Sequence, residues 1–94
     1  MSEYKVHCAD CKRLLGEEFG EVHEWLDEFF MLPKYGTHHR KVRHNQKGVE
    51  EVKAKWGIRA AWAAEIHIKR DLKEEGYDGD IPKDEEEYKK LDLW

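Results

Sequence analysis

Uncharged polar side chains are almost missing from this 94-residue sequence. Ser2, Thr37, Asn45 and Gln46 are the only serine, threonine, asparagine and glutamine. Charged residues make up 40% of the chain instead. Abundant lysine and glutamate with few thermolabile amides is typical of proteins from thermophiles, so the composition predicts a thermophilic source.

Long apolar runs are absent as well. No stretch approaches the roughly 20 residues that a helix needs to span a bilayer, and the N-terminus lacks the basic and then apolar pattern of a signal peptide. We therefore expect no membrane partner and a cytoplasmic location, where the two cysteines would be reduced. The length predicts a single domain, residues 1–94, and four tryptophans indicate a packed core rather than disorder.

Several enzyme signatures are also missing. The sequence contains no nucleotide-binding glycine loop, no nucleophile elbow and no H-E-x-x-H zinc motif. The net charge of −4 argues against a protein that coats DNA generally, because such proteins are usually basic. These absences leave open whether the protein is an enzyme.

Apolar residues recur with helical spacing, and nowhere do they alternate as in a half-buried strand. Gly48 weakens one of the predicted helices because it lies inside it, whereas Asp84 and Glu87 make a capping-box-like start for the last one. The sequence thus predicts an all-α fold, a small irregular bundle of four to five helices. The predicted segments are residues 8–15, 21–32, 38–56, 58–75 and 84–91.

Two pairs of histidine and aspartate have the spacing of one helical turn. His23 and Asp27 share a face of one predicted helix, and His67 and Asp71 share a face of another. A histidine and a carboxylate at the edge of an apolar stripe can together bind zinc, iron or manganese. For either pair alone, an ordinary ion pair on the helix surface is the more common explanation.

Basic residues are concentrated in one segment. "HHRKVRH" (38–44) lies inside a stretch, from Phe29 to Val49, that has no acidic residue. On a straight helix, Arg40, Arg43 and Lys47 would point away from the valine stripe. They form either a solvated basic face or a site for phosphate or carboxylate, which the guanidinium fork binds in a bidentate manner.

The sequence "HCADC" (7–11) contains a C-x-x-C pair, which alone is half of a zinc site. His39 and His44 could complete it, and His7 is a further possible ligand. The gap between the two halves is much longer than in a short zinc finger, so the signal is weak. Cys8 and Cys11 are more simply explained as small buried apolar residues.

Five pieces in order resemble an uncharacterised family of small phage, archaeal and bacterial proteins. The pieces are His7, "HEWLDE" (23–28), "HRKVRHNQKG" (39–48), "IHIKRDL" (66–72) and "GDIP" (79–82), which together span most of the chain. The family has no established function to carry over, and the C-x-x-C is not part of its pattern. The resemblance implies that one shared pattern includes His7, His23, Asp27, His39, Arg40, Arg43, His44, His67 and Asp71.

The leading hypothesis is a helical protein whose histidines and aspartates converge on a divalent metal, with zinc, iron, manganese and nickel all open. If the protein is an enzyme, metal-assisted phosphoester hydrolysis is the expected class. The alternative is a non-enzymatic module that contacts nucleic acid or an acidic partner through residues 34–47. A third hypothesis is a scaffold whose histidines only make hydrogen bonds in a small core. The candidate metal ligands are His23, Asp27, His39, His44, His67 and Asp71, and the candidate anion-binding residues are Arg40, Arg43 and Lys47.

Overall fold

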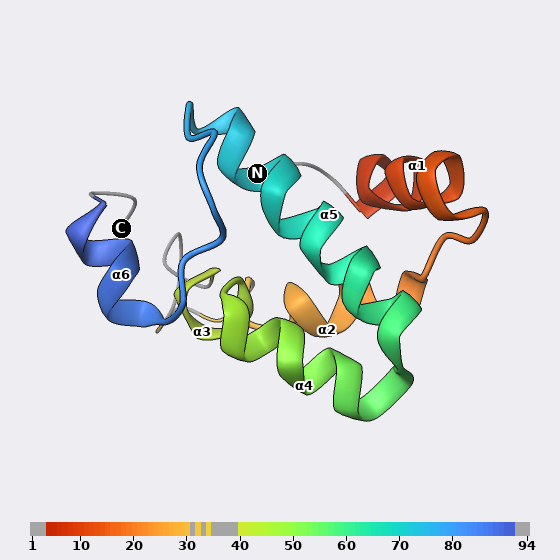
Figure 1. Ribbon diagram of the computed structural model, residues 1–94, viewed down its shortest axis with the longest axis horizontal. Coiled ribbons are helices and arrows are strands. Elements are labelled where there is room, and N and C mark those ends of the chain that lie inside the picture. The colour runs from red at the N-terminus through yellow and green to blue at the C-terminus, as the bar shows by residue number, and fades with distance from the viewer. Residues whose placement is uncertain (1–3, 31, 33, 35–39, 92–94) are drawn as a thin grey trace.

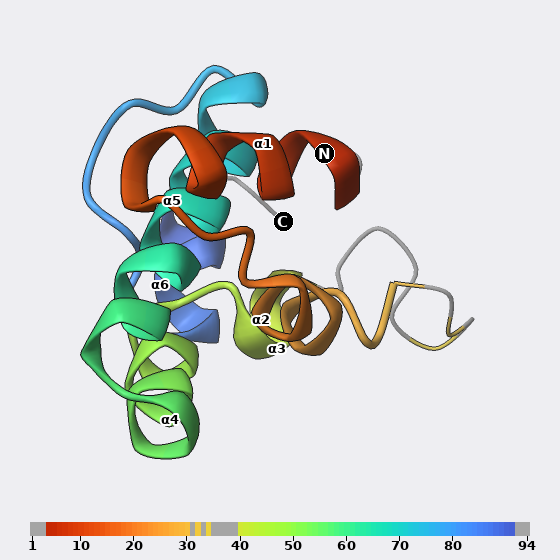
Figure 2. The ribbon, with the colours of Figure 1, turned by 90° about the vertical axis from the view of Figure 1, so that its right-hand side faces the viewer.

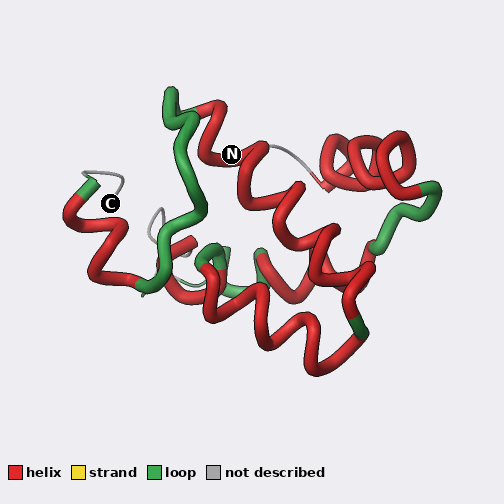
Figure 3. Tube along the Cα trace, in the orientation of Figure 1, coloured by secondary structure: helices red, strands yellow, loops and turns green. Residues whose placement is uncertain are grey.

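The fold is all-α, as predicted. The computed structural model describes all residues except 1–3, 31, 33, 35–39 and 92–94, and in that part of the chain there is no strand (Figures 1 and 3). The elements in chain order are α1 (Tyr4–Leu15), α2 (Gly20–Leu26), α3 (Arg40–Arg43), α4 (Gln46–Trp56), α5 (Ile58–Glu74) and α6 (Glu85–Lys90). No helix among the described residues has the length and apolarity to cross a membrane.

Helix α5 is the centre of the molecule. It lies between α1 and α4 in both views of the ribbon, and it contacts α1, α2 and α4 (Figures 1 and 2). Its alanines favour the helix intrinsically, and they present so little bulk that neighbouring helices can approach closely. Four of them are buried, together with Ile68 and Leu72 further along the helix: Ala60, Ala61, Ala63 and Ala64. His67 and Asp71 are buried on α5 as well, next to Ile68.

The predicted continuous helix over residues 38–56 is wrong. The chain instead forms α3 and α4, separated by a turn at His44 and Asn45. Asn45 has an extended backbone, and its side-chain oxygen accepts a hydrogen bond from the Gly48 amide at 2.9 Å. Asparagine is a preferred N-cap because it satisfies an otherwise unpaired amide, so it starts a new helix here. Gly48 permits the break, since a Cβ at this position would lie 1.8 Å from the carbonyl oxygen of Arg43.

The other helix boundaries differ less. Helix α2 ends at Leu26, before the predicted limit of 32, and the chain continues in tighter turns in which Phe30 donates its amide to the Asp27 carbonyl at 2.9 Å. Helix α1 starts earlier than predicted, at Tyr4. The start of α6 is as predicted, because the Asp84 carboxylate accepts a hydrogen bond from the Glu87 amide at 3.1 Å.

Candidate metal centre

Helix α5 supplies the first two side chains of the site. His67 and Asp71 are one turn apart, and the imidazole Nε2 lies 3.4 Å from the carboxylate Oδ2. Both residues are buried, with 0% and 1% exposure respectively. The spacing predicted that they would share a face of the helix; the packing of α1, α2 and α4 around α5 encloses that face.

His44 approaches the same point from the turn between α3 and α4. Its Nε2 lies 3.0 Å from Nε2 of His67 and 3.3 Å from Oδ2 of Asp71. Because the turn interrupts the helix, His44 points into the core rather than along the basic face that a straight helix would have created. The hydroxyl of Tyr88 on α6 donates a hydrogen bond to the His44 carbonyl.

Asp27, which follows the last residue of α2, completes the cluster. Its Oδ1 lies 3.1 Å from Nε2 of His44 and 3.4 Å from Nε2 of His67. The guanidinium of Arg43 ties this end of α2 to α3, because it donates to the Trp25 carbonyl at 2.7 Å. The Asp27 side chain keeps 20% of its surface exposed, which makes it the most exposed of the four, although the Oδ1 that faces the cluster is buried.

The spacing of these atoms suits a metal ion. The donor atoms of Asp27, His44, His67 and Asp71 all lie within 4.8 Å of one another. Five of the separations between them fall between 3.0 and 3.4 Å. In a tetrahedral site with bonds of about 2.0–2.1 Å, neighbouring ligand atoms are about 3.3–3.4 Å apart. The buried cluster could therefore hold a metal ion.

His23 orients His67 through a chain of hydrogen bonds. Nε2 of His23 lies 2.8 Å from the Glu18 carbonyl oxygen, and Nδ1 of His23 lies 2.9 Å from Nδ1 of His67. A carbonyl only accepts, so Nε2 of His23 carries the proton. Burial, reinforced by the neighbouring His67 and His7, lowers the pKa of His23 to about 4, so the ring is neutral near pH 7. Its Nδ1 is then an acceptor, and His67 must donate from Nδ1.

His7 covers the other side of the cluster from α1. Its ring stacks on that of His67, with centroids 3.5 Å apart and planes inclined by 16°. Its Nε2 lies 3.2 Å from Oδ1 of Asp71, the oxygen that does not face His44. Among the described residues, His7 Nδ1 has no hydrogen-bond partner although it is buried.

The pKa of Asp71 is strongly perturbed. Burial by itself would raise the pKa of its carboxyl group, but the close approach of the His44, His67 and His7 imidazoles outweighs burial and holds the pKa far below the usual range. The carboxylate is therefore ionised throughout the physiological pH range. A buried negative charge of this kind requires compensation by protons or by a cation.

The cysteines lie outside the cluster. Cys8 and Cys11 are buried free thiols on α1, and within the described residues neither belongs to a group of three or more metal-binding side chains. The Cys11 thiol contacts the Ala63 carbonyl at 3.9 Å, and burial raises its pKa to about 11. Of the histidines in the Cys2His2 alternative, His44 lies in the aspartate-containing cluster, and His39 is outside the described residues.

The candidate anion-binding residues do not gather at one described point. Lys47 is exposed on α4. The guanidinium of Arg43 lies 4.0 Å from the centre of the Trp25 ring and forms an ion pair with Glu28. Arg40 belongs to α3, and the position of its side chain is not described. The involvement of these residues with an anion stays a prediction.

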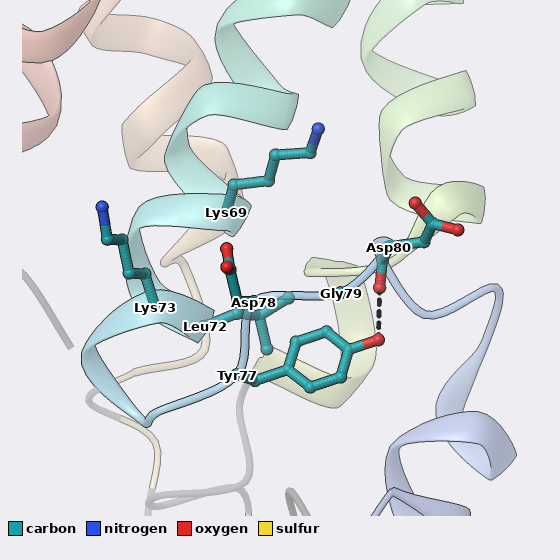
Figure 4. Close-up of a pocket in the computed structure, with 7 residues that line it drawn as sticks. All are labelled: Lys69, Leu72, Lys73, Tyr77, Asp78, Gly79 and Asp80. Carbon is teal, nitrogen blue, oxygen red and sulfur yellow. Dashed lines mark hydrogen bonds between the residues drawn. The ribbon is translucent and has the colours of Figure 1, made fainter.

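A pocket at the end of α5 is separate from the cluster. It lies between Lys69, Lys73 and the loop that follows the helix, where the Tyr77 hydroxyl donates to the Asp80 carbonyl at 2.7 Å (Figure 4). None of the clustered histidines or aspartates lines it. The pocket is therefore not part of the candidate metal centre.

Sequence reasoning missed the residues that position His44. Tyr88, Asn45 and Gly48 hold its turn, and none was a candidate site residue. Asn45 was a usable signal for a helix start, because asparagine is a preferred N-cap residue. The contact between Tyr88 and His44, 44 positions apart, has no local signature.

Comparisons with known proteins add no further evidence: no family model, curated protein or solved structure matches the chain. The resemblance carried by the five sequence pieces therefore stays a prediction.

Proposed function

We propose that this protein binds one divalent metal ion through His44, His67, Asp27 and Asp71. The observation that carries the proposal is the hydrogen-bond chain behind His67. The proton of a neutral His67 ring is on Nδ1, because that atom donates to His23. Its Nε2 therefore has a lone pair, which faces two carboxylate oxygens and a second imidazole. A lone pair among carboxylates is the arrangement that a cation, and not another acceptor, stabilises.

The charges of the cluster support a divalent ion. Two carboxylates converge there, and Asp71 is almost fully buried. A divalent ion would compensate both charges without protonating either imidazole. Two nitrogen and two oxygen ligands suit zinc, iron, manganese or nickel. The near-tetrahedral separations make zinc the first ion to test.

Burial favours a structural role for the ion. The side chains of His44, His67 and Asp71 are at most 2% exposed, and a set of four protein ligands is typical of closed structural sites. His23 would then be a residue that orients a ligand rather than a ligand. The ion would join α5 to the end of α2 and to the turn before α4, which are far apart in the sequence.

Metal-assisted phosphoester hydrolysis is a second candidate function. It is favoured by the partial exposure of Asp27, because water or a substrate could reach an ion from that side. Such an ion would lower the pKa of bound water. The rate of hydrolysis of bis(p-nitrophenyl) phosphate should then increase with the fraction of protein that carries an ion. It should also exceed the rate measured with the free ion alone. If fully loaded protein did not hydrolyse this substrate, the structural role of the ion would be the one supported.

Metal analysis of protein purified without a histidine tag tests the binding proposal. We expect about one ion per chain and a lower melting temperature in chelator. At an ion concentration a hundredfold above Kd, the folded state gains about 2.7 kcal/mol. Asp27→Asn keeps the shape of a partly exposed side chain and should weaken binding at least tenfold. Asp78→Asn, at an exposed aspartate outside the cluster, is the matched control and should bind like the wild type.

The competing explanation is a metal-free scaffold in which the histidines share protons with the carboxylates. In that case the purified chain would carry no ion, and chelator or added Zn²⁺, Mn²⁺ or Ni²⁺ would leave its melting temperature unchanged. Equal affinity of the wild type and Asp27→Asn would also reject the ligand set proposed above.

A further inference from the structure

We infer that the C-terminal segment, residues 81–91, is part of the metal centre's support, and that Tyr88 is the residue through which it positions His44. This inference rests on the proposed metal binding. It adds a conformational link, in which the ion and the docking of residues 81–91 stabilise each other.

Two hydrogen bonds attach the segment to the backbone of the turn that carries His44. The Tyr88 hydroxyl donates to the His44 carbonyl, and the Gln46 amide donates to the Pro82 carbonyl at 2.9 Å. The contacts fall on either side of Asn45, so the C-terminal segment fixes the turn at two points. Helix α6 contacts α3, and Figure 1 shows it at the opposite end of the molecule from α1.

The turn depends on such long-range contacts because its own helix is too short to hold it. Helix α3 has four residues, and an isolated helix of that length is not stable in water. The backbone of His44 lies in a bend after α3, and the residue is fully buried. A buried carbonyl needs a hydrogen-bond donor, and Tyr88 supplies one.

The segment depends on the turn in the same way. Helix α6 has six residues, and Tyr88 is the one among them that is buried. Tyr88 is 0% exposed, so its ring attaches α6 to the rest of the molecule. Its hydroxyl sets the position of α6 relative to the turn at His44, through the hydrogen bond to the His44 carbonyl. Ile81, with 4% exposure, is a second anchor at the other end of the segment.

Metal binding and docking of the segment should therefore be coupled. His44 is a proposed ligand, so fixing its backbone lowers the cost of bringing its imidazole to the ion. Coupling of this kind is reciprocal, and an ion that holds His44 must also hold the segment that contacts it. Loss of a group that supports a metal ligand typically weakens binding about 10- to 100-fold.

The test compares Tyr88→Phe with Tyr77→Phe by titration of the metal-free proteins with Zn²⁺ and Co²⁺. Phenylalanine keeps the buried ring and removes only the hydroxyl. Tyr77 is the matched control because its hydroxyl also donates to a backbone carbonyl, that of Asp80, but away from the cluster. We expect Tyr88→Phe to bind about 10- to 100-fold more weakly than the wild type, and Tyr77→Phe to stay within about twofold.

Hydrogen exchange of the wild type is the second measurement and requires no variant. Zn²⁺ should slow the exchange of amides in residues 84–91 more than in α1. Equal Zn²⁺ affinity of Tyr88→Phe and the wild type, or no change in exchange at 84–91 on binding, would overturn this inference and leave the metal site intact. A wild type that binds neither ion would instead overturn the proposed function.

Discussion

Replacement of Gly48 by alanine should destabilise the protein, although alanine is the better helix former. Gly48 lies in the first turn of α4, where an added Cβ would be 1.8 Å from the Arg43 carbonyl oxygen and 2.8 Å from its carbon. Real Cβ contacts essentially never fall below 3.0 Å, and the obstacle is backbone rather than a flexible side chain. The turn that carries His44 must therefore move by more than about an ångström.

The size of the effect follows from opposing contributions. Overpacking in a well-packed region costs about 1–3 kcal/mol of stability, and the higher helix propensity of alanine relative to glycine offsets about 0.5–1 kcal/mol of that loss. Displacement of the Gly48 amide also weakens its hydrogen bond to Asn45, and an N-cap contributes about 1 kcal/mol. We expect a net loss of about 1–3 kcal/mol, which in a domain of this size corresponds to a decrease in melting temperature of about 5–15 °C.

Thermal unfolding followed by far-ultraviolet circular dichroism, in chelator, measures this loss without contribution from a bound ion. Glu50→Ala is the control, because Glu50 is exposed on the same helix and its replacement should change stability by less than about 0.5 kcal/mol. A Gly48→Ala protein as stable as the wild type, or more stable, would show that helix propensity dominates and that the close approach of α3 and α4 is not required.

Four further predictions concern His23, the two cysteines and the basic segment. His23→Leu should weaken Zn²⁺ binding about 10- to 100-fold by removing the acceptor behind a ligand, and His23→Gln should restore part of it; equal binding by all three proteins would exclude the orienting role. Because the pKa of Cys11 is raised to about 11, little thiolate forms at pH 8, and a disulfide reagent should modify Cys11 much more slowly in the folded chain than in denaturant. Cys8→Ser should leave Zn²⁺ affinity unchanged, whereas a loss of affinity would support the Cys2His2 alternative. If residues 34–47 bind nucleic acid, affinity should fall by about one to three decades between low and moderate salt, and Lys47→Ala should reduce the salt slope by about one; no binding at low salt would identify a solvated basic face.

The sequence alone determined the all-α class and most of the helices. The apolar positions on α5 repeat with helical spacing, and its alanines favour that conformation locally. The start of α6 was also predictable, because the contact between Asp84 and the Glu87 amide spans three residues. Such features depend on neighbours in the sequence, and local physical chemistry is sufficient for them.

Helix boundaries near the site were less accessible. The break at Asn45 is favoured by its cap, but a continuous helix through His44 satisfies the same apolar periodicity. The choice between them depends on the approach of Gly48 to Arg43 and on the contact from Tyr88. Those contacts form only when α3, α4 and α6 are assembled.

The candidate site shows the same division. Helical spacing alone placed His67 and Asp71 on one face, because a turn of 3.6 residues brings positions four apart together. It could not show that Asp27 and His44 meet them, since those residues come from the end of another helix and from a turn. Nor could it assign His23 to the hydrogen-bond chain behind His67. Local sequence fixes the direction of a side chain relative to its own helix, whereas only the packing of helices decides which side chains converge.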